Sequence, residues 1–198
     1  MENINKPDMP DRRNGDMGTY KERLKELFNA KKSFFSLTDA DKEKFIEWAL
    51  QRHVRLRARD KKWLDKHPGN NMQLPEASKY FEAVYDALEK CNNKDYYTGY
   101  PLNWEISIED DPEQDACPAK VRQERITFDH VHGRDLSKLE FVMCAGKTND
   151  AKNDLSKEKF IDLCKTVLTH NGYTVSAPSG ISGLSQENES WHTLLKKN

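Results

Sequence analysis

Two short polar motifs, separated by an apolar segment, carry the residues of this chain best suited to chemistry. Asp129 and His130 close an expected strand, and Asn149 opens an expected helix after a second strand. Carboxylate and amide oxygens are ligands that Mg²⁺ accepts, and this ion normally keeps several of its waters. A neutral imidazole can take a proton near pH 7. Together the motifs could hold one metal ion and a general base within reach of a phosphodiester.

Two strands and a helix must bring these groups together. The segments 126–129 and 139–143 predict a pair of strands, and the segment 147–153 predicts a helix. Asp129 and His130 would point to opposite faces of the first strand. We therefore expect a twist or bulge at its end, so that one side chain faces the ion and the other faces the attacking water.

The order of these motifs resembles that of the HNH, or ββα-metal, endonuclease family. The similarity covers about residues 91–170 and depends on Asp129-His130, the apolar strand and the run from Thr148 to Asp154. It implies that Asp129 and Asn149 are metal ligands and that His130 is the general base. It also implies a phosphate contact from Lys152, which lies three residues after Asn149.

Further expectations follow from the same resemblance. The metal would be Mg²⁺, with Mn²⁺ as a substitute, and the reaction would be hydrolysis of DNA to 5′-phosphate and 3′-hydroxyl ends. Cys91 and Cys144 resemble single survivors of two zinc-binding pairs, with Tyr97 and Thr148 near the places of their partners. Because no C-x-x-C pair occurs, a structural Zn²⁺ is not expected.

Several assignments stay open at this point. The Asn that orients the catalytic His in the family has no clear counterpart, and Glu140 or a backbone carbonyl could take its place. Asn153 is an alternative ligand to Asn149. His132 could also reach the site, although a solvated loop position explains it more simply.

Periodicity and capping signals predict three helices in the region 19–90: one from near Tyr20, one from Thr38 to about Lys66, and one from Pro75. The second carries seven basic residues against two acidic ones between positions 52 and 66. A basic helix of this kind can bind nucleic-acid phosphates, although a solvated helical face explains it equally well. The residues expected to make those contacts are Arg52, Arg55, Arg59 and Lys62.

The expected fold class is therefore α+β, a helical N-terminal region followed by a ββα-metal core. A flexible arm is expected at 1–18, the helical region with its basic helix at 19–90, the core at 91–172 and a C-terminal tail at 173–198. The alternation from Trp104 to Ile108 predicts a further strand, and the acidic stretch after it predicts a loop.

Composition narrows the function classes. The 198 residues are 33% charged and carry a formal net charge of −1, so the overall charge does not by itself indicate nucleic-acid binding. No apolar run approaches the length of a membrane span, and no hydrophobic signal region begins the chain, so we expect no membrane partner and an intracellular, cytoplasmic location.

The sequence as a whole predicts a metal-dependent endonuclease with DNA as its partner. One alternative is a module that keeps the fold, binds nucleic acid and has lost the chemistry. Another is a nuclease or toxin directed at RNA. A homodimer is also open, and it would decide between nicking and double-strand cleavage.

Overall fold

The computed structural model describes residues 17–109 and 123–176. These residues form a mixed fold of helices and one two-stranded antiparallel sheet, which agrees with the expected α+β class. The arm expected at 1–18, the acidic loop and the tail expected at 173–198 lie largely outside the described residues. The chain divides into two compact units, one ending at Phe160 and the other beginning at Ile161.

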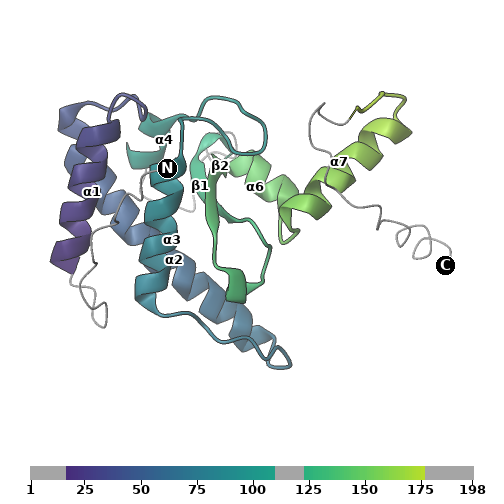
Figure 1. Cartoon of the computed structure of the whole chain (residues 1–198), viewed down its shortest axis with the longest axis horizontal. Helices are drawn as coiled ribbons and strands as arrows, with labels where there is room; N and C mark the ends of the chain where they lie inside the picture. The colour runs from purple at the N-terminus through teal and green to yellow at the C-terminus, as the bar shows by residue number, and fades with distance from the viewer. Residues whose placement is uncertain (1–16, 110–122, 177–198) are drawn as a thin grey trace, which may run out of the picture. The chain divides into compact units, whose positions relative to one another are not determined.

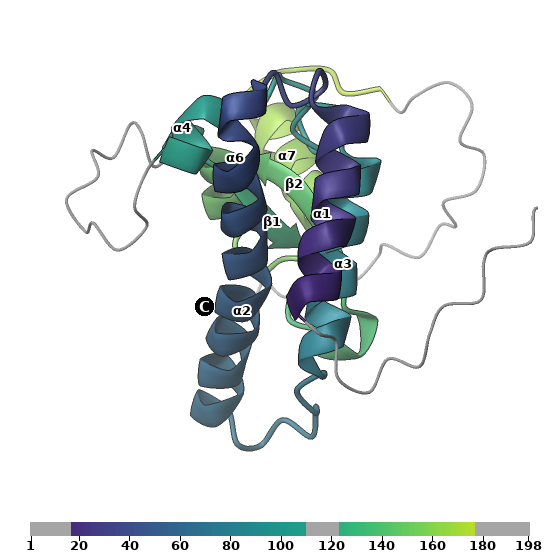
Figure 2. The same cartoon turned by 90° about the vertical axis from the view of Figure 1, so that its left-hand side faces the viewer.

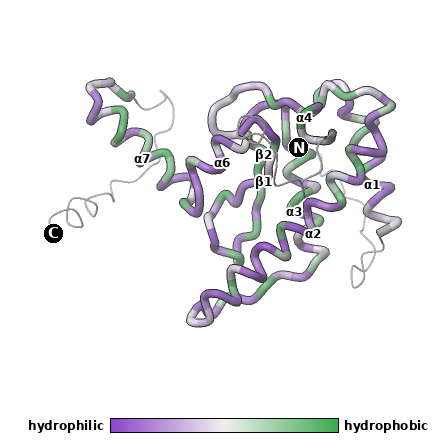
Figure 3. The backbone as a smooth tube through the Cα atoms, turned by 180° about the vertical axis from the view of Figure 1, so that it is seen from behind, coloured by the Kyte–Doolittle hydropathy of each residue, from purple (hydrophilic) through white to green (hydrophobic). Residues whose placement is uncertain are grey.

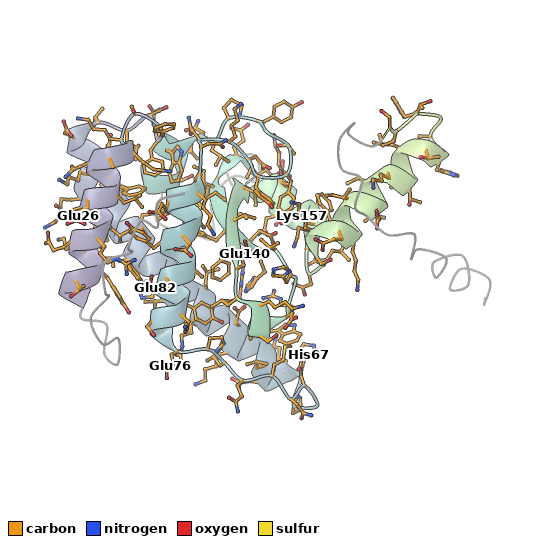
Figure 4. All side chains as sticks on the ribbon, in the orientation of Figure 1. Glu26, His67, Glu76, Glu82, Glu140 and Lys157 are labelled. Atoms are coloured by element: carbon orange, nitrogen blue, oxygen red, sulfur yellow. The ribbon has the colours of Figure 1, made fainter. Side chains whose placement is uncertain are left out.

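Three helices form the N-terminal part of the first unit: α1 (Met17–Lys31), α2 (Lys42–Lys66) and α3 (Ala77–Lys90). A short 3-10 helix, η1 (Asp39–Asp41), leads into α2, and Asp41 accepts hydrogen bonds from the backbone and the hydroxyl of Thr38. Figure 2 shows these helices in front of the sheet. Glu82 of α3, labelled in Figure 4, forms a two-point ion pair with Arg23 of α1 at 2.7 and 3.1 Å.

The sheet pairs β1 (Ile126–His130) with β2 (Phe141–Ala145), and α6 (Gly146–Lys152) follows β2 directly. The two strands lie between α2 and α3 on one side and α6 on the other (Figure 1). Side chains alternate along β1, so Phe128 and His130 face the N-terminal helices while Asp129 faces α6. The connection between the strands contains the 3-10 helix η2 (Leu136–Lys138).

One hydrophobic core joins the N-terminal helices to the sheet. Trp48 of α2 packs against Phe128 of β1 with ring centres 5.6 Å apart, and against Trp104 at 5.7 Å. Along α1, α2 and α3 hydrophobic residues alternate with hydrophilic ones, as expected for helices with one buried face (Figure 3). The helical region and the segment after it therefore share one core that holds α2 against β1.

The strand expected from Trp104 to Ile108 is wrong, because this segment forms the helix α4 (Trp104–Glu109). Asn103 caps it, since its side-chain oxygen accepts the backbone N–H of Ile106 at 3.3 Å. Trp104 and Ser107 are both buried, and their spacing of three residues places them on one helical face. The apparent alternation was thus a short piece of helical periodicity.

The last described helix is α7 (Lys157–His170). The backbone N–H of Lys157, labelled in Figure 4, donates to the carbonyl of Val131 at 2.9 Å and so ties the first turn of α7 to the end of β1. No helix among residues 17–109 and 123–176 combines the length and the apolar character that crossing a membrane requires.

The turn after β1 depends on a glycine. Gly133 has φ of +64°, and a Cβ there would lie 2.5 Å from the carbonyl oxygen of Asp154. We expect Gly133→Ala to lower the free energy of unfolding by about 1–3 kcal/mol in a urea titration. Gly69→Ala is the matched control, because a Cβ at Gly69 meets no atom within 4 Å. Equal stability of the two variants would contradict this account of the turn.

Candidate functional site

A pocket of about 260 Å³ lies at the end of β1, between α2 and α6. Its walls are strongly polar, and its lining residues are Arg59, Asp129, His130, Gly133, Arg134, Asn149, Asp150, Asn153 and Asp154. The three residues expected to form the reactive centre, Asp129, His130 and Asn149, are all among them. The fold therefore brings together groups that lie on two different elements.

The contacts of His130 determine which ring nitrogen carries the proton. Nε2 lies 2.9 Å from a carboxylate oxygen of Asp60, which can only accept while it is ionised. Nδ1 lies 3.4 Å from a guanidinium nitrogen of Arg59, which can only donate. The neutral ring that satisfies both partners carries its proton on Nε2. The basic lone pair is then on Nδ1, beside Arg59, which lines the pocket.

Asp60 of α2 is the orienting residue that sequence reasoning missed. Its carboxylate is fully buried and accepts hydrogen bonds from Tyr80 at 2.8 Å, from His130 at 2.9 Å and from Arg134 at 2.9 Å. Burial alone would raise the pKa of this carboxyl group, but the hydrogen bonds from His130 and Tyr80 and the charge of Arg59 outweigh it and hold the pKa below its usual value.

A signal for Asp60 was present in the sequence. Ala49, His53, Leu56 and Asp60 follow one another at helical spacing, and all four are buried. A carboxylate on the buried stripe of an amphipathic helix requires a buried partner. The signal is hard to see because Asp60 lies in a run of basic residues, where its charge is outnumbered.

Arg134, in the pocket wall, links its own segment to two others. Its guanidinium donates to Asp60 on α2 at 2.9 Å and to Asp154, after α6, at 2.7 Å. Arg134 itself lies in the connection after β1. The ion pairs of Arg134 with Asp60 and Asp154 therefore help to fix the pocket wall.

Asp129 is held by two donors, a half-buried tyrosine and a fully buried lysine. Its Oδ2 accepts the hydroxyl of Tyr97 at 2.6 Å and lies 2.9 Å from Nζ of Lys152. Burial and then this hydrogen bond raise the pKa of Tyr97, so the phenol stays protonated and donates. Among the described residues, the other carboxylate oxygen of Asp129 has no partner, and it is the atom left for a ligand in the pocket.

Lys152 does not lie where a phosphate contact would require. Its side chain is fully buried, and its ammonium binds Asp129 and the backbone carbonyl of His130 at 2.8 Å. A cation with no exposed surface cannot reach a phosphate outside the protein. Lys152 instead joins α6 to the end of β1 and neutralises Asp129.

Glu140 and Asn153 lie in different surroundings. Glu140 does not orient it, because its carboxylate lies 3.0 Å from Nε2 of His132 at the exposed edge of the loop. Asn153 is exposed, has a positive φ of 52° and lines the same pocket as Asn149. The orienting role belongs to Asp60, whose position in the chain is 70 residues from that of His130.

The four basic residues expected on α2 have different surroundings. Arg59 lines the pocket, and Arg52 lines a neighbouring one. Arg55 donates to Gln51 at 3.2 Å, one helical turn earlier, and Lys62 is exposed to solvent. Of the four, Arg59 and Arg52 are therefore the ones that line pockets next to the residues expected to form the reactive centre.

The segment where the resemblance would place zinc ligands is organised by a carboxylate. Buried Asp95 accepts the backbone N–H groups of Tyr97 and Thr98 at 2.9 and 3.0 Å and that of Ala145, on β2, at 2.8 Å. Cys91 and Cys144 are both buried, and burial raises the pKa of each thiol. Hydrogen bonds from one carboxylate thus tie this loop to the sheet.

A divalent ion at this site would have few protein ligands. Residues 17–109 and 123–176 contain no group of three or more His, Cys, Asp and Glu side chains able to hold a metal. Asp129 and Asn149, which carry a carboxylate and an amide oxygen, nonetheless line the same pocket. Two such oxygens suit Mg²⁺, which is commonly bound through one or two carboxylates with most of its waters kept. The residues fit a weakly held Mg²⁺.

No match to this chain was found among protein-family models, curated proteins or solved structures.

The role of Asp60 can be tested through stability. Asp60→Asn removes the charge that three donors share, so we expect a loss of about 3–5 kcal/mol in the free energy of unfolding at pH 7. Because the pKa of Asp60 is lowered in the folded state, its contribution is present above pH ~4 and is lost as the pH falls below it. The difference in free energy of unfolding between wild type and Asp60→Asn should therefore become smaller below pH ~4.

Two controls accompany this measurement. Asp65→Asn makes the same change at an exposed position of α2 and should shift stability by less than about 0.5 kcal/mol. Tyr80→Phe removes one donor and should cost about 1 kcal/mol. An Asp60→Asn protein as stable as Asp65→Asn would contradict the central position given to this carboxylate.

The structural role of Lys152 gives a second prediction. Lys152→Met keeps the length of the side chain and leaves the buried Asp129 without its cation, so we expect a loss of about 3 kcal/mol or more in a denaturant titration. Lys147→Met, at an exposed position of the same helix, should be nearly neutral. Unchanged stability with weakened nucleic-acid binding would return Lys152 to the role of a phosphate contact.

Proposed function

We propose that this chain is a divalent-metal-dependent endonuclease of the HNH kind, which hydrolyses DNA phosphodiester bonds with His130 as general base. The observation that carries the proposal is the meeting of three groups in one pocket: the imidazole of His130, the carboxylate of Asp129 and the amide of Asn149. The order of two antiparallel strands and a short helix that presents these groups also agrees with the resemblance.

In the proposed reaction Nδ1 of His130 takes a proton from a water molecule in the pocket. The oxygen of that water forms a bond to phosphorus while the bond from phosphorus to the 3′ oxygen breaks. The leaving 3′ oxygen takes a proton from solvent. Asp60 accepts the Nε2–H throughout, so it keeps the ring in the required tautomer and stabilises the imidazolium that forms.

Arg59 would hold the phosphate, in the role expected of Lys152 from the sequence. Its contact with Nδ1 of His130 is long, at 3.4 Å, and its side chain is exposed, so it can exchange that nitrogen for a phosphate oxygen. This exchange would free the lone pair of His130 at the moment that substrate binds. The pocket thus couples binding to activation of the base.

Asp129 and Asn149 would hold the metal ion. When bound, a divalent ion supplies Lewis-acid neutralisation of the phosphate and of the departing oxygen. Lys152 already neutralises part of the charge on Asp129, so binding of the ion should be weak. We therefore expect the protein to need a free concentration of Mg²⁺ well above that of the enzyme.

The same ion pair favours a second candidate function, nucleic-acid binding without cleavage. The buried carboxylate of Asp129 already has a neutralising cation, Lys152, and a hydrogen-bond donor, Tyr97, without a metal. A binding module with this pocket would retain DNA and leave it uncut. Plasmid DNA incubated with Mg²⁺, with Mn²⁺ and with chelator separates the two functions directly.

Removing the base gives the decisive measurement. His130→Ala should lower the cleavage rate about 10²- to 10⁴-fold, because general-base catalysis contributes about that factor. His132→Ala is the matched control, since that ring pairs with Glu140 at the exposed loop edge. It should cut at the wild-type rate. Nicking of plasmid by the His130→Ala protein at full rate would exclude the proposed role.

The substrate class is decided in the same assay. Matched DNA and RNA strands should be compared with wild type and with His130→Ala, because the nucleophile is water for either polymer. Faster cleavage of RNA, dependent on His130, would support the site and correct the substrate. Retention of DNA without cleavage under every metal condition would favour the binding module.

A further inference from the structure

A second basic pocket lies beside the proposed reactive centre. It has a volume of about 140 Å³, and its walls include Arg52 from α2, Arg125 just before β1, Thr127 of β1, and Asn149 and Asp150 of α6. Neither Arg125 nor Thr127 was a candidate at the level of sequence. We propose that this pocket binds a second phosphate of the same nucleic-acid strand, flanking the bond that is cut.

The charge of the pocket supports an anionic ligand. Burial, and then the neighbouring charges of Arg55 and Arg125, lower the pKa of Arg52 to about 10, so the guanidinium stays protonated at neutral pH. Among the residues that the structure describes, Arg52 forms no ion pair with a carboxylate. A half-buried guanidinium that lies near the charges of two other arginines is stabilised by a bound anion.

Arg52 is also held in place before any ligand arrives. Its guanidinium carbon lies 5.1 Å from the centre of the Trp48 ring, and Trp48 is part of the core. Such a contact fixes the side chain and leaves the edge of the guanidinium for hydrogen bonds. Asp150 opposes an anion here, but its side chain is exposed to solvent.

The two pockets lie at a spacing that fits one strand. Asn149 and Asp150 line both, so α6 forms their shared wall. Arg52 and Arg59 lie seven residues apart on α2, which corresponds to about 10 Å along the helix axis. Phosphates of one DNA strand advance about 3.4 Å per nucleotide along the duplex, so the second phosphate lies within about three nucleotides of the first.

This inference rests on the proposed function for the identity of the ligand, and its test does not require cleavage. The affinity of the full-length protein for a labelled duplex oligonucleotide is measured by fluorescence anisotropy in chelator, between about 50 and 200 mM salt. Arg52→Gln should bind about tenfold more weakly at the lower salt. Its plot of log affinity against log salt should be shallower by about 0.9, the value for one lost phosphate contact.

Two further variants guard against a purely structural effect. Lys61→Gln removes one positive charge from the opposite side of α2, where the residue is exposed, and should leave the salt slope within error of wild type. Arg52→Lys keeps the charge and much of the packing on Trp48, so it should recover most of the slope. A slope for Arg52→Gln equal to that for Lys61→Gln would overturn the proposal.

The outcomes for the two proposals can be told apart. A wild-type protein that binds but never cuts, with a slope that depends on Arg52, keeps the phosphate pocket and rejects the nuclease. If the protein cuts DNA through His130 but the salt slope is unchanged in Arg52→Gln, the nuclease proposal is supported and the phosphate pocket is rejected.

Discussion

The buried carboxylate of Asp60 is the interaction on which the rest of the site depends. It lies where α2, α3, β1 and the connection after β1 meet, and it accepts from Tyr80, His130 and Arg134. A buried carboxylate is stable only when its oxygens are fully paired, so packing α2 against the sheet requires these donors to take fixed positions. One charge therefore sets both the junction between helices and sheet and the orientation of the imidazole.

The distribution of cations around this carboxylate separates structural from ligand-facing charges. Lys152 and Arg134 neutralise Asp129, Asp60 and Asp154 within the protein. Arg52 and Arg59 lie instead on the face of α2 that borders the two pockets, and neither forms an ion pair with a described carboxylate. The protein as a whole is nearly neutral, while Arg52 and Arg59 place positive charge beside the two pockets. The overall composition does not show this local charge.

Local patterns were good predictors where local forces decide the structure. The paired strands, the helix after them and the long basic helix ending before Pro68 all follow from periodicity and capping. Trp104 to Ile108 was misassigned because five residues can fit either period, and the cap at Asn103 decided in favour of a helix. Lys152 was misassigned for a different reason. No residue near it in the sequence indicates that its ammonium is buried against Asp129.

The sequence by itself determined that Asp129 and His130 end one strand, that Asn149 lies on the helix after the next, and that α2 is basic. These properties depend on residues close together in the chain, whose spacing is set by strand and helix geometry. Only the tertiary structure decided that Asp60 binds His130, that Lys152 is buried and that Arg59 borders the pocket at the end of β1. Each of these depends on how α2 or α6 packs against β1, and packing is decided by the shared core and by the pairing of buried charges.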